Sequence, residues 1–270
     1  MLRDLMFPQD AQKELAALVT GLGYDAALAV AGKRLSEIPP ENDQPDFCVP
    51  VRASGASEDQ AVRRDAPVLF SRFAIISMVS RFETYLNHLL LQRRVLEFLG
   101  TTPGRKMDGP NFWRILIAVQ QASKAGPVSL CHAVATNHSS ELQVRMEWLD
   151  GLYRVRNCLA HRLGIVQMVD VKPPGVSLDK TKAEDRLRAK WLRVQLRRNG
   201  EEITLPHTFH AESNVQISFE EYVREWKIGD QIDVQPEECQ YIAFSMSYLA
   251  RQIETEFERE MTEGLGLGGK

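Results

Sequence analysis

The sequence has few cysteines, and none of them has the spacing of a metal site. Cys48, Cys131, Cys158 and Cys239 are scattered over 270 residues without a Cys-x-x-Cys or Cys-x-His pattern. This scarcity argues against a disulfide framework and against a structural zinc site. Cys158 lies inside a helical run, where a free cysteine usually serves as a small buried apolar residue. We therefore expect no metal and no other cofactor.

Long apolar runs and a strong charge of one sign are also missing. No stretch of about 18 uninterrupted apolar residues occurs, so no membrane span is expected. The first residues, MLRDLMFPQDAQKEL, mix charges and proline with apolar residues and lack the apolar region of a signal peptide. A net charge of −3 predicts no global attraction to nucleic acid. These absences predict a cytoplasmic protein, and 44% apolar residues suffice for a sizeable core.

Apolar residues recur with helical spacing over most of the chain. Residues 9–38 predict two helices, DAQKELAALVTGLG and YDAALAVAGKRLSEI, whereas residues 39–66 contain four prolines and predict a linker. The strongest helix is predicted over residues 67–100, where Ile75, Val79, Phe82 and Leu86 share one face. Further helices are predicted over 109–126, over 139–163 with a core stripe of Trp148, Leu152, Val155, Leu159 and Leu163, and from Pro236 onward.

Between residues 165 and 219 the apolar period changes from helical to alternating. GIVQMVDVK, WLRVQLRRNGEEITLP and VQISF predict strands, and Asn199-Gly200 predicts a tight hairpin turn. The expected fold class is mainly α, a helical bundle with a small inserted β-hairpin or sheet before its last helix. The expected divisions are an N-terminal helical extension and linker (1–66), a helical domain (67–262) and a disordered tail (263–270).

One polar group stands out in the predicted helix 139–163. The stretch RVRNCLAHRLG places Arg156 and Asn157 ahead of His161. At about 100° per residue, Asn157 and His161 share the face opposite the core stripe, whereas Arg156 lies about 140° from His161. Arg156 and His161 therefore meet over one small ligand only if the last turn deforms near Gly164 or if two copies of the helix pair across a dimer axis.

These residue types suit metal-free cleavage of RNA. His161 exchanges a proton near neutral pH and suits general acid/base work on a 2′-hydroxyl or on the 5′-oxygen leaving group. Arg156 supplies forked donors and a fixed charge for a phosphate, and Asn157 can hold either by hydrogen bonds. The alternative is an ordinary solvated helix end, in which Arg156 forms a structural ion pair with Glu83 of the helix 67–100.

A second candidate feature is a basic strip over residues 180–198. It holds eight Lys or Arg residues and two acids, a net +6 that leaves −9 for the rest of the chain. Such a strip can follow an RNA backbone and stack a base on an aromatic ring. Its candidate RNA-binding residues are Lys190, Trp191, Arg193, Arg197 and Arg198. The alternative is a solvated hairpin edge whose charges protect it from aggregation.

Four segments in order resemble the HEPN family of the RiboL-PSP-like ribonuclease superfamily. RNCLAH resembles its Arg-x4-6-His motif, with the common Asn after the Arg. SMVSRFETYLNHLL is similar to the first conserved HEPN helix, HRLGIVQ to the run that leaves the motif helix, and KIGDQIDVQPEE to the segment before the final helix. Together the segments span residues 67–262, most of the chain.

The resemblance implies a helical bundle that dimerises and brings two Arg/His pairs into one cleft. It implies a metal-independent endoribonuclease that leaves 2′,3′-cyclic phosphate ends, in a toxin–antitoxin or anti-phage defence setting with an antitoxin or defence partner. Arg156 and His161 match the motif as catalytic residues, Asn157 matches its polar position, and Glu83 matches the supporting glutamate of the first helix. Two alternatives stay open: a non-catalytic interaction module, and a toxin silenced by a neighbouring antitoxin.

Overall fold

The structure, a computed structural model, is mainly helical and carries one three-stranded sheet. The sheet stands before the last helix, which confirms the mainly α class with a β insertion. The structure describes residues 7–37, 56–100, 107–135, 140–171, 186–198, 201–203 and 215–264.

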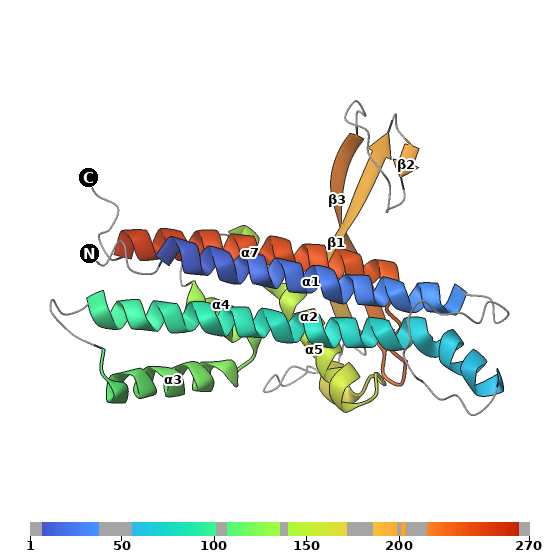
Figure 1. The fold of residues 1–270 in the computed structure, drawn as a ribbon, viewed down its shortest axis with the longest axis horizontal. Coiled ribbons are helices and arrows are strands. Elements are labelled where there is room, and N and C mark those ends of the chain that lie inside the picture. Colours follow the sequence, from blue (N-terminus) through green and yellow to red (C-terminus); the bar gives the residue numbers. More distant parts are fainter. Residues whose placement is uncertain are drawn as a thin grey trace, which may run out of the picture.

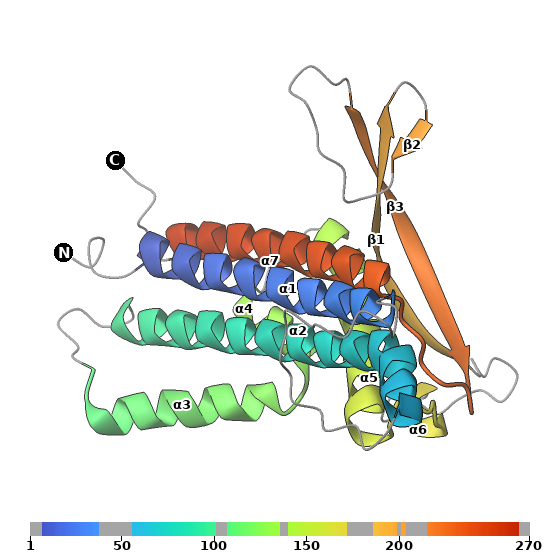
Figure 2. The same cartoon turned by 45° about the vertical axis from the view of Figure 1, so that its right-hand side comes forward.

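Three long helices run side by side and form the body of the molecule (Figures 1 and 2). They are α1 (Phe7–Glu37), α2 (Ala56–Gly100) and α7 (Pro236–Gly264). The residues that α1 adds to the core are Leu18, Leu22, Ala26 and Ala29, and α2 adds the predicted face of Ile75, Val79, Phe82 and Leu86. The segment expected to be an N-terminal extension therefore shares the core of the bundle.

The prediction of two helices over residues 9–38 is wrong, because α1 continues unbroken through its glycines. A β-carbon at Gly21 would lie 3.0 Å from the side chain of Arg81 on α2. That guanidinium reaches α1 and donates to Asp25 at 2.9 Å. Glycine at position 21 therefore allows a close helix contact, and the chain stays helical through Gly23, where the break was predicted.

Two other expectations about helices need correction. Helix α2 begins at Ala56, so residues 56–66 of the predicted linker are helical and Pro67 lies inside the helix. The segment GIVQMVDVK was predicted as a strand, but it forms a single bridge at Ile165 and then the short helix α6 (Met168–Val171). The predicted helix 109–126 is α3 (Gly109–Ser123), and α4 (Pro127–Val134) follows it.

Helix α1 is long and apolar enough, over Gln12–Arg34, to cross a membrane by length and composition. The count of uninterrupted apolar residues in the sequence misses this stretch. In the structure, α1 lies against α2 and α7 (Figure 2) and is joined to both by ion pairs, from Asp25 to Arg81 and from Lys33 to Glu237. These contacts are those of a bundle helix.

The sheet has the strand order β2-β1-β3, and both pairs are antiparallel. β1 (Arg186–Arg198) pairs with β2 (Glu201–Ile203) in the register Arg198 to Glu201, so the two strands are paired as the predicted hairpin requires. The turn residues Asn199 and Gly200 lie outside the described residues. β3 (Val215–Lys227) pairs with the full length of β1 and is longer than the predicted VQISF. One end of the sheet extends beyond the helices (Figure 2).

Two helices hold β1 against the bundle through small residues. Ser245 on α7 accepts a hydrogen bond from the backbone N–H of Leu192 at 2.7 Å. On α5 (Ser140–His161), a β-carbon at Gly151 would lie 2.7 Å from the carbonyl oxygen of Arg188. Helix α5 thus approaches the strand so closely that only glycine fits at position 151.

Substituting Gly151 is expected to destabilise the protein because a backbone atom blocks the added methyl group. Gly151→Ala should lower the free energy of unfolding by about 1–3 kcal/mol, the usual range for overpacking. The matched control is Gly23→Ala in α1, where nothing lies within 4 Å of the added atom. That variant should gain about 0.5–1 kcal/mol from helix propensity. Urea denaturation of both variants measures the difference, and equal effects would contradict the close contact.

Glu254 on α7 is buried, and its Oε1 atom has no hydrogen-bond partner among the described residues. Burial raises the pKa of its carboxyl, and Glu258 adds to the shift. A carboxyl with a raised folded-state pKa binds its proton more tightly when folded, so stability falls as the pH rises through this range. Glu254→Gln should therefore stabilise the protein at about pH 7 and lose this advantage by about pH 3, below ordinary carboxyl pKa values. Urea titrations across this pH range test it, with Glu263→Gln at an exposed position of α7 as the control.

Candidate functional site

Arg156 points from α5 toward α2 and is held on several sides. Its Nη1 atom donates to Oδ1 of Asn157 at 2.8 Å. Its Nη2 atom lies 3.4 Å from the Ser80 hydroxyl and 3.4 Å from the Glu83 carboxylate, so the predicted Glu83–Arg156 ion pair is present. The guanidinium carbon lies 5.8 Å from the centre of the Tyr153 ring. The guanidinium is therefore positioned by neighbours on both helices.

Sequence reasoning found Glu83 but missed Ser80 and Tyr153. Ser80 lies one helical turn before Glu83, and its hydroxyl donates to the carbonyl of Ile76 at 2.8 Å, which leaves its oxygen lone pairs for Arg156. Tyr153 lies one turn before Arg156 on α5. Burial raises the pKa of the Glu83 carboxyl, and the charge of Arg156 opposes that shift. Their positions in the sequence could have indicated both residues, because Ser80 lies one helical turn from Glu83 and Tyr153 lies one turn from Arg156.

His161 is the last residue of α5 and is exposed to solvent. Within the part of the chain that the structure describes, its imidazole makes no hydrogen bond or ion pair. The helix ends after it, where Leu163 and Gly164 have φ angles of 55° and 80° and the Gly164 N–H donates to the carbonyl of Cys158 at 3.1 Å. Because α5 is helical through His161, its last turn does not bring Arg156 and His161 together. Of the two routes to convergence, pairing of two copies remains.

The chain beyond α5 lies beside the segment that precedes α7. The N–H of Val166 donates to the carbonyl of Asp230 at 2.9 Å, and the N–H of Ile232 donates to the carbonyl of Gly164 at 2.7 Å. HRLGIVQ and KIGDQIDVQPEE, two segments that resemble HEPN sequences, are therefore neighbours in space. A third, SMVSRFETYLNHLL, contributes Ser80 and Glu83 to the surroundings of Arg156 on the same helix.

The residue after His161 fixes the end of α5. Arg162 forms a two-pronged ion pair with the buried Asp170, with Nε donating to Oδ2 at 2.9 Å. Asp170 also accepts the N–H of Gln167 at 2.8 Å. Cys158 lies beside this pair, and burial raises the pKa of its thiol to about 11. Cys158 is therefore a buried apolar residue, as expected, and not an activated thiol.

An exposed apolar surface lies next to His161. It consists of Leu163, Ile165, Met168 and Val169, called here the end patch. Leu163 is 79% exposed, so its predicted place in the core stripe of α5 is wrong, although Trp148, Leu152, Val155 and Leu159 are buried as predicted. The positive φ of Leu163 turns the chain away before the next helical position. Adjacent exposed apolar side chains of this kind mark interaction surfaces.

The basic strip differs from the predicted RNA-binding surface. Trp191 is fully buried, with its ring 5.6 Å from that of Tyr222, so the prediction that it stacks a base is wrong. Lys190 pairs with Glu147 at 3.2 Å and with Glu221 at 3.4 Å. The antiparallel pairing of β1 with β3 places glutamates of β3 beside basic residues of β1. The sequence could not show this neutralisation without the register of the two strands.

The other members of the strip are placed as follows. Arg193 is half-buried, and Arg197 is exposed and contacts Gln195 on its own strand at 3.5 Å. Arg198 pairs through its backbone with Glu201 and Val215, and its side chain lies outside the described residues. Among the described residues, no group of three His, Cys, Asp or Glu side chains is arranged to hold a metal ion.

Comparisons of the chain with protein-family models, with curated proteins and with solved structures find no match. The functional assignment therefore depends on the residues themselves. The strongest of them are Arg156, Asn157 and His161 on the last turns of α5, with the end patch beside them.

Proposed function

We propose that this protein is a metal-independent endoribonuclease of the HEPN type, with an active site shared by two subunits of a homodimer. One observation carries the proposal: the exposed His161 ends a regular helix beside the end patch, with Arg156 fixed about 140° away on the same helix. A second copy that covers the end patches brings the two ends of α5 together and supplies the convergence that one chain lacks.

In this site, His161 serves as the general acid and base, and Arg156 stabilises negative charge. His161 removes the proton of the 2′-hydroxyl, the 2′-oxygen attacks the phosphorus, and the bond from phosphorus to the 5′-oxygen breaks. The leaving 5′-oxygen takes its proton from the imidazolium of the partner subunit's His161. The products are a 2′,3′-cyclic phosphate and a 5′-hydroxyl. Arg156 stabilises the charge that develops on the phosphate oxygens, and Asn157 orients the guanidinium through its hydrogen bond.

The position of His161 suits this role. His161 is the last residue of α5, so its side chain lies at the end of the helix that carries Arg156. The imidazole is also exposed, so an RNA strand can reach it. Arg156 is only partly exposed and is already oriented by Asn157, Ser80 and Glu83, which lowers the entropy cost of binding a phosphate.

The proposed setting is cytoplasmic defence. An exposed imidazole beside an apolar surface can also be covered by another protein, such as an antitoxin or a defence partner. Covering the end patch would then silence the enzyme by blocking the dimer.

The test is an RNA cleavage assay with the purified full chain in excess EDTA. We expect cleavage of unstructured RNA, products with 2′,3′-cyclic phosphate ends, and a dimer by light scattering. Added Mg²⁺ should not be required. A dimer that leaves a diverse set of RNAs intact under these conditions would contradict the proposal.

A second candidate is a non-catalytic assembly module. It is favoured by the contacts of Arg156, because a guanidinium held by Glu83, Ser80 and Asn157 also serves a purely structural role. In that case Arg156→Ala would lower the thermal stability, and no RNA would be cleaved by either protein. The cleavage assay in EDTA separates the two candidates.

A further inference from the structure

We infer that single-stranded RNA binds to an aromatic ladder formed by Phe219, Phe244 and Tyr248, with a nucleobase stacking on the outer face of Phe219. The ladder joins β3 to α7, since Phe219 belongs to the strand and the other two residues lie one turn apart on the helix. The inference rests on the proposed ribonuclease function for its biological meaning, but binding at the ladder is measured separately from cleavage.

The three rings form a nearly parallel stack. The centroids of Phe219 and Phe244 are 5.5 Å apart and their planes differ by 8°. Those of Phe244 and Tyr248 are 6.4 Å apart with planes at 15°. Parallel offset rings of this kind present flat π-faces in register, and such faces are what nucleobases stack on.

A cation closes the inner end of the stack. The guanidinium carbon of Arg145 on α5 lies 4.4 Å from the centre of the Tyr248 ring and 5.6 Å from that of Trp148. Arginine over an aromatic face is held by cation–π attraction. The inner end of the ladder is therefore fixed by a planar cation, and the outer end remains available to a ligand.

The outer rings are exposed. Phe219 is 56% exposed and Phe244 37%, and Val223 on the same face of β3 is exposed as well. Two stacked phenylalanines at the surface expose apolar area to water, a cost that a stacked ligand would remove. Every nucleobase has a π-face, so each further base can continue the stack whatever its identity. This property suits the binding of a single strand without strong sequence preference.

The charge distribution of this chain makes stacking the main source of its affinity for RNA. The net charge is −3, and basic residues of β1 are paired with glutamates of β3, as Arg186 and Arg188 are with Glu225. A basic side chain that is already paired with a carboxylate releases few counterions from a phosphate backbone, so affinity cannot come mainly from phosphate contacts. The affinity for RNA therefore comes mainly from uncharged stacking contacts at the ladder and not from the basic strip.

The ladder and the candidate active site are joined by one helix. Arg145 and Arg156 lie eleven positions apart on α5, which corresponds to about three turns and about 16 Å of rise. At about 3.4 Å per stacked nucleotide, that distance equals about five nucleotides. Because the RNA binds at the outer end of the ladder, beyond Arg145, a strand that reaches Arg156 must be longer than about five nucleotides.

The test measures binding by the full chain with cleavage switched off. Fluorescein-labelled twelve-nucleotide poly(U) and poly(A) strands are titrated with His161→Ala protein, with or without Phe219→Ala and Phe244→Ala, and anisotropy is recorded. Loss of both rings should weaken binding about 10-fold or more. Val223→Ala, on the same face of β3, is the matched control and should bind like the parent. Binding by the parent should weaken less than about 10-fold between about 50 and about 200 mM salt.

Further variants keep the result interpretable. Phe219→Tyr with Phe244→Tyr retains the rings and should restore binding, which excludes a folding defect as the cause. If the double alanine variant binds RNA like the parent, or if it becomes monomeric by light scattering and tyrosine does not rescue it, the ladder is not an RNA site. If the wild-type chain cleaves no RNA but the rings still govern binding, the ribonuclease proposal fails and the ladder stands.

Discussion

Replacing His161 with alanine is expected to reduce RNA cleavage by at least about 100-fold, the usual contribution of a positioned general acid or base. His161 is exposed at the end of α5 and its imidazole makes no hydrogen bond or ion pair with another described residue, so its removal should leave the fold intact. The rate of cleavage in EDTA and the thermal unfolding midpoint should be measured on the same preparation. A large loss of rate with an unchanged midpoint identifies a chemical role.

The matched control is His132→Ala on α4. His132 is also an exposed histidine near the end of a helix, but it lies outside the candidate site. That variant should cleave RNA at the wild-type rate. Full activity of His161→Ala would remove His161 from the active site, and equal losses in both variants would point to a general effect on the protein.

Mixing wild-type and His161→Ala chains tests whether the site is shared. In the proposed mechanism one cleavage uses His161 of both subunits, so a dimer with one His161→Ala subunit lacks either its base or its acid. After subunit exchange in an equal mixture, about a quarter of the dimers carry both histidines, so the rate should be about a quarter of that of the same amount of wild-type chain. A rate of about half would mean that each subunit cleaves on its own.

The bundle was predictable because its signals are local. Helical periodicity, Gly100 as an end and the pairing of the strands on either side of Asn199-Gly200 depend on residues near one another in sequence, and each matches the structure. The errors occur where distant contacts decide. A break was predicted after Gly23, whereas α1 is continuous and Gly21 lets Arg81 of α2 lie against it. Residues 56–66 were predicted as a linker but form the start of α2.

The candidate site follows the same division. The helical angle between Arg156 and His161 and the pair of Arg156 with Glu83 could be predicted from spacing along two helices. The burial of Trp191 and the neutralisation of Lys190 could not, because both depend on which residues of β3 lie opposite β1. The aromatic ladder was invisible for the same reason, since its rings come from β3 and α7.

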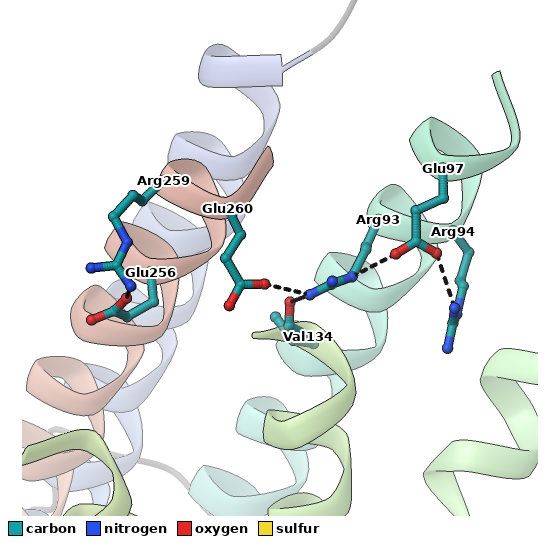
Figure 3. A network of polar contacts seen from close by, with 7 residues as sticks. All are labelled: Arg93, Arg94, Glu97, Val134, Glu256, Arg259 and Glu260. Atoms are coloured by element: carbon teal, nitrogen blue, oxygen red, sulfur yellow. Dashed lines mark hydrogen bonds and ion pairs between the residues drawn. The ribbon is translucent and has the colours of Figure 1, made fainter. Parts of the chain in front are cut away.

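Far from the candidate site, a network of charged residues joins three helices (Figure 3). Arg93 on α2 donates to Glu97 at 2.8 Å, to Glu260 on α7 at 2.9 Å and to the carbonyl of Val134, the last residue of α4, at 2.6 Å. The side chains of Arg93 and Glu260 are only 13% and 7% exposed. The Arg93–Glu260 pair is thus largely removed from water. Arg93 also satisfies a carbonyl group at the C-terminal end of α4.

Replacing Arg93 with alanine is expected to lower the free energy of unfolding by about 3 kcal/mol, because the largely buried Glu260 carboxylate loses the positive charge of Arg93. The neighbouring Arg94 supplies the control, since it also contacts Glu97 but is 48% exposed. Arg94→Ala should cost less than about 1 kcal/mol, as exposed pairs do. Urea denaturation measures both variants. Glu260→Gln in the Arg93→Ala background should recover part of the lost stability, because it removes the negative charge that Arg93 had balanced. Equal costs for Arg93 and Arg94 would show that burial does not set the strength of this network.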